Sequence, residues 1–280
     1  MSLDDSWFTE TNSGYGISLK IQQRIYEEQT PFQKIDIYQT ETFGRLMTLD
    51  GLFMLTSRDN FIYHEMMSHP ALYCHQNPKD VAIVGGGDCG TLKEVLKHDT
   101  VKQVTQIELD ERVTRVSEQY FPELCESNSD PRATLLFEDA ISWMQRALPD
   151  SLDVIILDTT DPVGQAKRLF EEPFYRDCFN ALREGGIVVA QSESPLLMLD
   201  VLTDLRSEMK KADFTELQTI QFPLATYPSG WWTATLARKG QKFGDFREQM
   251  SRHKPFETKY YNADIHKACS ALPQFVLDAF

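Results

Sequence analysis

The sequence has few cysteines, and their arrangement predicts neither a cross-link nor a metal site. Its five cysteines are widely scattered without CxxC spacing, so we expect no disulfide framework and no zinc knuckle. It also lacks an apolar run approaching the ~18 residues of a membrane span. The start, MSLDDSWFTE, is polar and acidic where a secretory signal would be basic and then apolar. We therefore expect a cytoplasmic protein with no membrane partner.

Basic residues are scarce relative to acidic ones. The 280 residues include 28 Lys and Arg against 42 Asp and Glu, which gives a formal net charge of −14. Because nucleic-acid binding needs a basic surface, this balance argues against a nucleic-acid partner and favours cationic ligands. The 41% hydrophobic and 25% charged residues indicate a globular chain with a packed core.

Residues 1–59 show the alternation typical of half-buried antiparallel strands. Every second residue from Tyr15 to Ile21 is apolar or aromatic and would lie on one face. Asp50-Gly51, between LMTL and LFML, is a strong hairpin signal because glycine tolerates a positive φ. We predict a small N-terminal antiparallel β domain over these residues.

Residues 60–280 have a different pattern, in which a helix from about Asn60 is followed by short apolar runs that alternate with helical stretches. Such runs are typical of parallel strands buried on both faces. They are VAIVGG, VTQIEL, ATLLFED, DVIILD and IVVAQ, and the predicted helix FYRDCFNALRE separates the last two. The closing pair, ELQTIQFPL and WWTATLARK, should form an antiparallel hairpin at the sheet edge. The predicted fold is α/β, a Rossmann-like, methyltransferase-type, seven-stranded mostly parallel sheet.

Acidic residues end four of these strands, where ligands bind in open α/β sheets. The strand ends carry Gly85-Gly86-Gly87-Asp88, Glu108 with Asp110, Asp139, and Asp158 with Asp161. The glycines would let the backbone approach a ligand. Glu108 follows them by about twenty residues, the spacing of an acid that holds both ribose hydroxyls. Asp88 would repel a pyrophosphate, so we expect a nucleoside that lacks phosphates and carries positive charge.

Some of these acids have a structural explanation as well. Asp110 and Asp139 are each equally well explained as N-caps of the following helices. Asp158 and Asp161 fit a functional role better, because two carboxylates three residues apart repel each other unless a cation or a proton lies between them. Tyr227, in the turn before the last strand, could hydrogen-bond a ligand or stack on its cation.

The histidines give no metal signal. In HEMMSH, residues 64–69, the two histidines are five residues apart, about 140° around a helix. A zinc-protease helix needs them four apart on one face. We expect no metal site here and a hydrogen-bonded His69.

Longer motifs extend over nearly the whole chain. They are FGRLMTLDG, RDNFIYHEMMSHPAL, VAIVGGGDCG, IELDERV, VIILDTTDPVG, TYPSGWW and YYNADIHKACSALPQFV. Together they strongly resemble the polyamine aminopropyltransferases, the spermidine synthases. The resemblance implies an N-terminal β domain, a Rossmann-like catalytic domain, a homodimer or homotetramer, and no metal or cofactor. It implies transfer of the aminopropyl group of decarboxylated S-adenosylmethionine, a co-substrate, to putrescine, which gives spermidine and methylthioadenosine.

The resemblance also implies where each substrate binds. Around the donor it places Gln33, Asp88, Glu108, Asp139 and Ala140, with Asp158 beside them and the glycine turn, Gly85, Gly86 and Gly87, beneath. Glu108 would hold the ribose hydroxyls, Asp139 the adenine amino group, and Asp88 the amine of the aminopropyl arm. Around the acceptor it places Tyr63, His64, Asp158, Asp161 and Tyr227.

Within this set Asp158 matches the catalytic base, and Tyr63 and Asp161 lie beside it as the other candidate catalytic residues. The strand ends add one residue to the acceptor site. A diamine also has a distal ammonium, and Glu193, at the end of the fifth run, would hold it together with Asp161.

Four places depart from the family pattern. Cys89 replaces the usual glycine of GGGDG, Ala140 the glycine of DG, Ser192 the glycine of QGE, and the run Gln165-Ala166-Lys167-Arg168 a loop that resembles PAES. Lys167 and Arg168 would oppose a longer polycation if they faced inward, although such loop residues commonly face solvent. Putrescine is therefore the first acceptor expected, with spermidine, cadaverine and agmatine as alternatives.

Two other functions stay open at this point. A methyltransferase that uses ordinary S-adenosylmethionine would share the fold and the ribose-binding acid, but Asp88 would repel the α-carboxylate of that donor. A catalytically inactive polyamine-binding protein would need no base. The retention of Tyr63, Asp158, Asp161 and Tyr227 argues against it.

Overall fold

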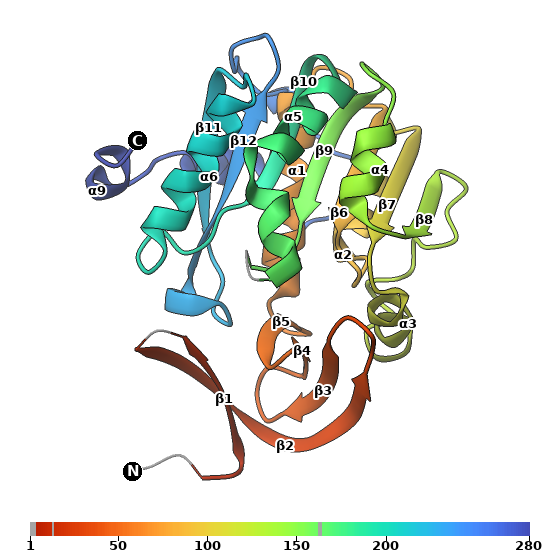
Figure 1. Cartoon of the computed structure of the whole chain (residues 1–280), viewed down its shortest axis with the longest axis vertical. Helices are drawn as coiled ribbons and strands as arrows, with labels where there is room; N and C mark the ends of the chain where they lie inside the picture. Colours follow the sequence, from red (N-terminus) through yellow and green to blue (C-terminus); the bar gives the residue numbers. More distant parts are fainter. Residues whose placement is uncertain (1–3, 13, 162–163) are drawn as a thin grey trace.

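The computed structural model describes residues 4–12, 14–161 and 164–280, which form two sheets with the smaller one beneath the larger (Figure 1). The N-terminal antiparallel sheet contains, in spatial order, β1 (Trp7–Asn12), β2 (Tyr15–Gln29), β3 (Lys34–Thr40), β4 (Arg45–Leu49) and β5 (Leu52–Thr56). The second sheet has the order β11 (Glu216–Pro223), β12 (Trp231–Arg238), β10 (Leu182–Gln191), β9 (Leu152–Asp158), β6 (Asp80–Gly85), β7 (Gln103–Glu108) and β8 (Ala133–Phe137).

The predicted fold class is confirmed. In the larger sheet β6 to β10 pair in parallel, whereas β12 pairs antiparallel with both β10 and β11. The hairpin predicted at the sheet edge is therefore present. In the smaller sheet, β4 and β5 are joined by Asp50 and Gly51 at φ +50° and +85°, the two positive values that a tight type I′ turn requires.

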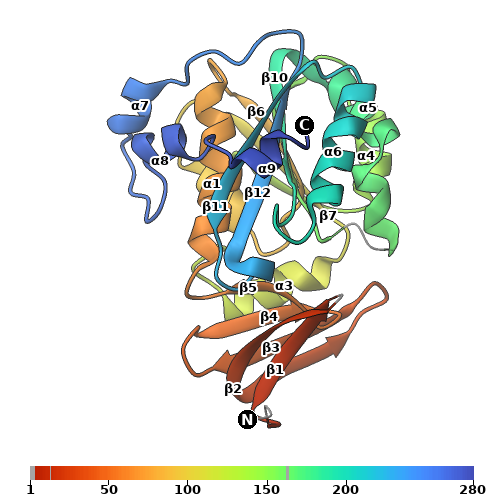
Figure 2. The same ribbon diagram turned by 90° about the vertical axis from the view of Figure 1, so that its left-hand side faces the viewer.

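The central strands are apolar throughout because helices cover both faces of the sheet. Val81 and Ile83 of β6 pack against α1 (Asn60–Cys74) and α2 (Gly90–Leu96). Ala82 and Val84 belong to the core on the opposite face, formed with α4 (Ala140–Arg146), α5 (Glu172–Ala181) and α6 (Leu199–Lys211). Figure 2 shows these two helix groups on either side of the sheet.

One predicted boundary is wrong. The pattern FYRDCFNALRE suggested a helix to Glu184, but α5 ends at Ala181 and β10 begins at Leu182. The chain enters the sheet early because the Leu182 backbone pairs with Leu152 of β9. Gly185, at φ +81°, lies where the register of this pairing shifts, so the strand includes an irregular stretch that an apolar pattern does not reveal.

Two further features connect the parts of the chain. Val113 and Val116 of α3 (Glu111–Tyr120) share a core cluster with Ile35 and Ile37 of β3, so this helix packs on the N-terminal sheet.

The C-terminal segment is held on α1 by buried Glu65. The remaining elements are η1 (Gly164–Phe170), η2 (Pro228–Gly230), α7 (Glu248–Arg252), α8 (Ala263–Ala268) and α9 (Gln274–Leu277).

The Glu65 carboxylate accepts hydrogen bonds from the backbone N–H groups of Lys259, Tyr260 and Tyr261, at 2.8, 2.9 and 2.7 Å. These bonds fix the C-terminal segment beside the helix that carries Tyr63 and His64. Among the described residues no helix has the length and apolarity needed to cross a membrane.

Candidate active site

The glycine turn after β6 lies directly against two of the predicted acids. A Cβ on Gly85 would lie 2.2 Å from the Asp158 carbonyl oxygen, and one on Gly86 would lie 3.0 Å from Asp158 Oδ2. A Cβ on Gly87 would lie 2.8 Å from Glu108 Oε2. The glycines are therefore needed for the acidic ends of β7 and β9 to pack around the turn, whatever ligand binds there.

Asp158 ends β9, and each of its oxygens accepts one hydrogen bond. The Tyr63 hydroxyl donates to Oδ1 at 2.8 Å, and Thr91 Oγ1 donates to Oδ2 at 2.6 Å. Burial, and after it the negative charge of Asp88, raises the pKa of Asp158, while the two hydroxyl donors oppose that rise. The carboxylate is thus held in one orientation with its affinity for a proton increased.

Asp88 pairs with His64, which the resemblance places on the acceptor side. The Nε2–Oδ2 distance is 3.1 Å, and Gly90 N–H donates to Asp88 Oδ1 at 2.6 Å. Burial disfavours the charged imidazolium, but the adjacent Asp88 carboxylate overrides this and raises the pKa of His64 to about 9. Conversely, burial raises the pKa of Asp88, but His64 outweighs it and the net pKa is lowered. At neutral pH His64 and Asp88 therefore form an ion pair, and both groups lie close enough to Asp158 to affect its pKa.

Glu108 and Gln33 both hydrogen-bond to Asp110, in the part of the site that is predicted to bind the nucleoside. Glu108 Oε1 accepts a hydrogen bond from Asp110 N–H at 2.9 Å, and Gln33 Nε2 donates to Asp110 Oδ2 at 3.2 Å. Burial, with the Asp110 charge adding to it, raises the pKa of Glu108 to about 7 despite this backbone bond. The turn between β2 and β3 therefore places an N-terminal residue next to the predicted ribose site.

The capping explanation holds for the two acids to which it was applied. Asp110 accepts from Arg112 N–H at the start of α3. Asp139 accepts from Ile141 N–H and Ser142 N–H, at 3.1 and 3.3 Å, and Ala140 is the first residue of α4. Asp139 is exposed at the rim, and its role as an adenine ligand stays a prediction.

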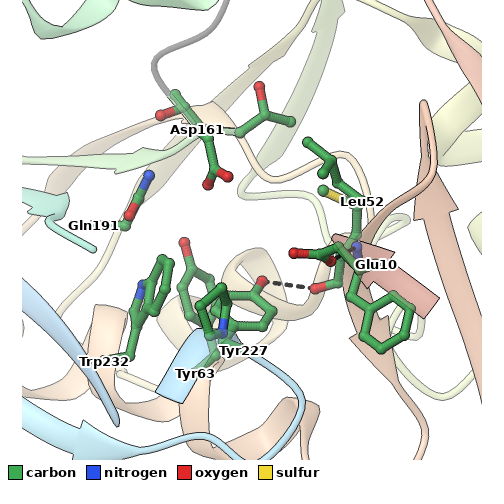
Figure 3. A pocket seen from close by; sticks show the side chains of 12 residues that line it. Glu10, Leu52, Tyr63, Asp161, Gln191, Tyr227 and Trp232 are labelled. Carbon is green, nitrogen blue, oxygen red and sulfur yellow. Dashed lines mark hydrogen bonds between the residues drawn. The ribbon is translucent and has the colours of Figure 1, made fainter. Parts of the chain in front are cut away.

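A pocket lies between the two sheets (Figure 3). The N-terminal sheet supplies one wall and the carboxyl ends of the larger sheet supply the other, with Asp161 facing Tyr63 and Tyr227 across the space. Its lining residues are Glu10, Leu52, Phe53, Met54, Tyr63, Thr159, Thr160, Asp161, Gln191, Tyr227, Pro228 and Trp232.

Two acidic groups beside Asp161 make one end of this pocket carboxylate-rich. Glu193 is fully buried at φ +65°, and its Oε1 accepts a hydrogen bond from Gln191 Nε2 at 3.4 Å. Burial, together with the charge of Asp161, raises the pKa of Glu193 well above its usual range. Glu10 of β1 lines the pocket, accepts from Phe53 N–H at 2.5 Å, and has its pKa raised by burial.

Sequence reasoning missed Glu10. It is one of several acids near the start of the chain, and its hydrogen-bond partner Phe53 is 43 residues away. No local pattern distinguishes it from solvated neighbours such as Asp5.

Tyr227 also differs in detail from the expectation. Its hydroxyl donates to the Met54 carbonyl oxygen at 2.7 Å, the bond drawn in Figure 3, so its only proton is already used. Its ring lies 5.8 Å from that of Tyr63, centroid to centroid. Of the two roles proposed, this geometry favours aromatic contact with a cation over donation to a ligand.

His69 is hydrogen-bonded, as expected, to His98 at 2.9 Å and to Glu94 at 3.1 Å. In the described ranges, no three His, Cys, Asp or Glu side chains are grouped so that they could hold a metal ion. Lys167 and Arg168 are exposed and lie outside the set of described pocket-lining residues. The side chain of Gln165, also part of the altered loop, lies outside the described residues.

The fold is that of the methyltransferase-like class of doubly wound proteins, and acidic side chains are clustered at the carboxyl ends of its strands. Residues 60–246 match the spermine/spermidine synthase domain and residues 6–57 the spermidine synthase tetramerisation domain. The chain belongs to the spermidine synthase family of aminopropyltransferases.

Individual relatives agree with this assignment. A polyamine aminopropyltransferase of Thioalkalivibrio sulfidiphilus is 58% identical over 276 residues, 98% of each chain. One of Nitrosococcus oceani is 55% identical over 279 residues, 99% of this chain and 98% of the relative. A crystal structure of spermidine synthase in complex with the transition-state analogue AdoDATO has a TM-score of 0.94 at 36% identity, covering 100% of this chain and 96% of that one. Aminopropyl transfer, not methyl transfer, is thus the reaction class.

Proposed function

We propose that the protein transfers the aminopropyl group of decarboxylated S-adenosylmethionine to putrescine, giving spermidine and methylthioadenosine. The observation that carries the proposal is the position of Asp158, at the strand end between the donor-side acids Asp88 and Glu108 and the pocket lined by Asp161 and Glu10. We infer that the donor, a cationic nucleoside, binds at Asp88 and Glu108, and that the diamine binds in the pocket lined by Asp161 and Glu10.

The chemistry follows from this placement. Asp158 holds one ammonium of the diamine and accepts its proton, which frees the nitrogen lone pair. The nitrogen attacks the propyl carbon attached to the sulfonium sulfur, a C–N bond forms, and the C–S bond breaks. The electron pair of that bond stays on sulfur, so methylthioadenosine leaves neutral. No step requires a cofactor or a metal, and we propose that the donor is consumed as a co-substrate.

Putrescine is proposed because the pocket holds carboxylates at one end and Asp158 near the other. A guanidinium or a third amine would need acidic groups in addition to Glu10, Asp161 and Glu193. Mass-spectrometric product analysis tests the reaction, with both sulfonium donors and with putrescine, cadaverine, agmatine and spermidine as acceptors. A higher kcat/KM for spermidine or agmatine would overturn the acceptor while leaving aminopropyl transfer intact.

We also propose that the chain forms homodimers or homotetramers through its N-terminal sheet, because residues 6–57 match a tetramerisation domain. Sedimentation analysis distinguishes a monomer, a dimer and a tetramer. A cytoplasmic location, and the absence of nucleic-acid and membrane partners, stay predictions.

Donor choice gives the first quantitative expectation. Decarboxylated S-adenosylmethionine should be used at least tens of times better than ordinary S-adenosylmethionine, because the α-carboxylate of the latter would approach Asp88. Two carboxylates ~4 Å apart repel by roughly 1 kcal/mol in water and by more in a buried site. Calorimetric titration with both donors measures the ratio, and equal affinities would contradict this role of Asp88.

Donor affinity should also depend on the ionisation of Glu108. Its pKa of about 7 means that most of the carboxylate is protonated at pH 6, whereas ribose hydroxyls are held best by the anion. The donor should therefore bind about tenfold more weakly at pH 6 than at pH 8, as only the ionised fraction is competent. Glu108→Gln should weaken binding by about 1.5–3 kcal/mol and abolish this pH dependence. Unchanged donor affinity in the variant would leave Glu108 without a role in binding.

A further inference from the structure

Thr91 contacts the reactive carboxylate but matches none of the residues that the sequence motifs single out. It lies in the first turn of α2, is fully buried, and donates its hydroxyl proton to Asp158 Oδ2 at 2.6 Å. Asp158 is 67 residues away along the chain, so the bond joins α2 to the end of β9. It is the counterpart of the Tyr63 bond to Oδ1, which comes from α1.

Other buried hydroxyls nearby have ordinary structural partners. Thr114 donates to the Gly87 carbonyl oxygen at 2.9 Å, and Ser117 donates to the Val113 carbonyl oxygen one helical turn before it, at 2.8 Å. Helical serine and threonine commonly form such backbone bonds. Thr91 instead donates its hydroxyl proton to the Asp158 carboxylate, and a hydrogen bond to a charged group is stronger than one between neutral partners.

Two donors on different oxygens restrict rotation of the Asp158 carboxylate about the Cβ–Cγ bond. They also stabilise its anion against burial and against nearby negative charge. Titratable groups face Asp158 from every element packed around it. They are Tyr63 and His64 from α1, Asp88 from the turn after β6, Glu108 from β7, and Tyr227 from the turn before β12.

We propose that Thr91 is a positioning residue for aminopropyl transfer, which holds the Asp158 carboxylate in the orientation and ionisation state that the acceptor amine requires. The inference rests on the proposed role of Asp158 as the base. It adds a residue from α2 that acts on the reaction through Asp158.

The test compares Thr91→Val, which exchanges the hydroxyl for a methyl group of similar size, with the wild type. The profile of kcat/KM for putrescine between pH 5 and 10 reports ionisations of the free enzyme. Without the Thr91 hydroxyl the Asp158 anion is less stable, so Asp158 keeps its proton to a higher pH. The acid limb of the profile, the pH range below which kcat/KM falls, should therefore move up by about one pH unit, a tenfold change in proton affinity. At pH values where Asp158 is mostly protonated in both proteins the variant should be about tenfold slower, and it should recover most of that loss at alkaline pH.

Matched variants separate positioning from packing. Thr91→Ser keeps the hydroxyl, so its acid limb should lie at the wild-type pH. Thr91→Ala should shift the acid limb as Thr91→Val does, and it serves as the test variant if Thr91→Val does not fold. Thr114→Val, in α3, removes a buried hydroxyl that donates to the glycine turn and has no bond to Asp158, so the pH dependence should stay that of the wild type. The proposal would be overturned if the acid limb of Thr91→Val and Thr91→Ala lay at the wild-type pH. It would also be overturned if Thr114→Val shifted the acid limb as far as Thr91→Val does.

Infrared spectroscopy provides a readout that does not need turnover. The C=O stretch of protonated Asp158, identified by its loss in Asp158→Asn, should appear at higher pH in Thr91→Val than in the wild type. If Asp158→Asn keeps its kcat, the proposed base is wrong. If that variant is inactive and the stretch titrates alike with and without the Thr91 hydroxyl, only the role of Thr91 is wrong.

Discussion

Asp158→Asn should lower kcat by about 10²–10⁴, the range typical of positioned general-base catalysis. A protonated amine has no lone pair for the attack, and an amide cannot take up its proton. Both oxygens of Asp158 also accept from hydroxyls, so the NH₂ group of asparagine would replace one acceptor by a donor facing Tyr63 or Thr91. Steady-state kcat with saturating donor and putrescine measures the effect.

The matched control for this variant is Asp153→Asn. Asp153 lies on the same strand, is buried, and accepts from Lys79 N–H and Asp80 N–H at 2.8 and 2.9 Å, at the end of β9 away from the site. Its loss should cost stability but not change kcat in the folded protein. Wild-type activity should rise toward alkaline pH, as more amine is unprotonated. A near-normal kcat in Asp158→Asn, or a rate that falls steadily from pH 7 to 9, contradicts the assignment.

The parts that sequence could predict are those governed by local rules. Continuous apolar runs identify strands covered on both faces, and Asp50-Gly51 fixes a hairpin because both residues must adopt positive φ. The acids at strand ends could be placed at one rim because parallel strands end on the same edge of a sheet. The structure does bring Asp88, Glu108 and Asp158 together there.

What sequence could not predict depends on contacts between distant segments. Glu10 becomes a pocket residue only because β1 lies over the ends of β9 and β10, and Thr91 reaches Asp158 only through the packing of α2. The phenol of Tyr227 appears available in the motif but is bound to the Met54 carbonyl oxygen. The charge of His64 likewise depends on Asp88, 24 residues away. Partners of this kind have no signature in a single sequence.

The carboxylate-rich end of the pocket should make the enzyme strongly selective for diamines. 1-Butylamine has the carbon chain of putrescine but no second ammonium, so Glu10, Asp161 and Glu193 would stay unpaired with a cation. Truncating one partner of a buried charge pair costs about 2–5 kcal/mol, and every 1.4 kcal/mol is about tenfold. We expect kcat/KM for 1-butylamine to be lower than for putrescine by on the order of 10²-fold or more.

Glu10→Gln tests whether the N-terminal sheet contributes to this selectivity. Burial and the charge of Asp161 raise the pKa of Glu193 well above its usual range and so favour its neutral form, whereas the Phe53 N–H bond to Glu10 stabilises the Glu10 anion. Glu10 should therefore supply much of the negative charge that meets an incoming ammonium. The variant should raise the KM for putrescine about tenfold, leave that for 1-butylamine unchanged, and leave donor KM unchanged.

Glu41→Gln provides the control, because Glu41 is an exposed acid of the same region that pairs with Lys20 at 2.9 Å. If a general loss of negative charge mattered, the two variants would weaken putrescine alike. If Glu10 holds the distal ammonium, only Glu10→Gln should reduce the ratio of kcat/KM for putrescine to kcat/KM for 1-butylamine. Equal use of putrescine and 1-butylamine by the wild type would show that the carboxylates bind no second ammonium, and would remove the argument for a diamine acceptor.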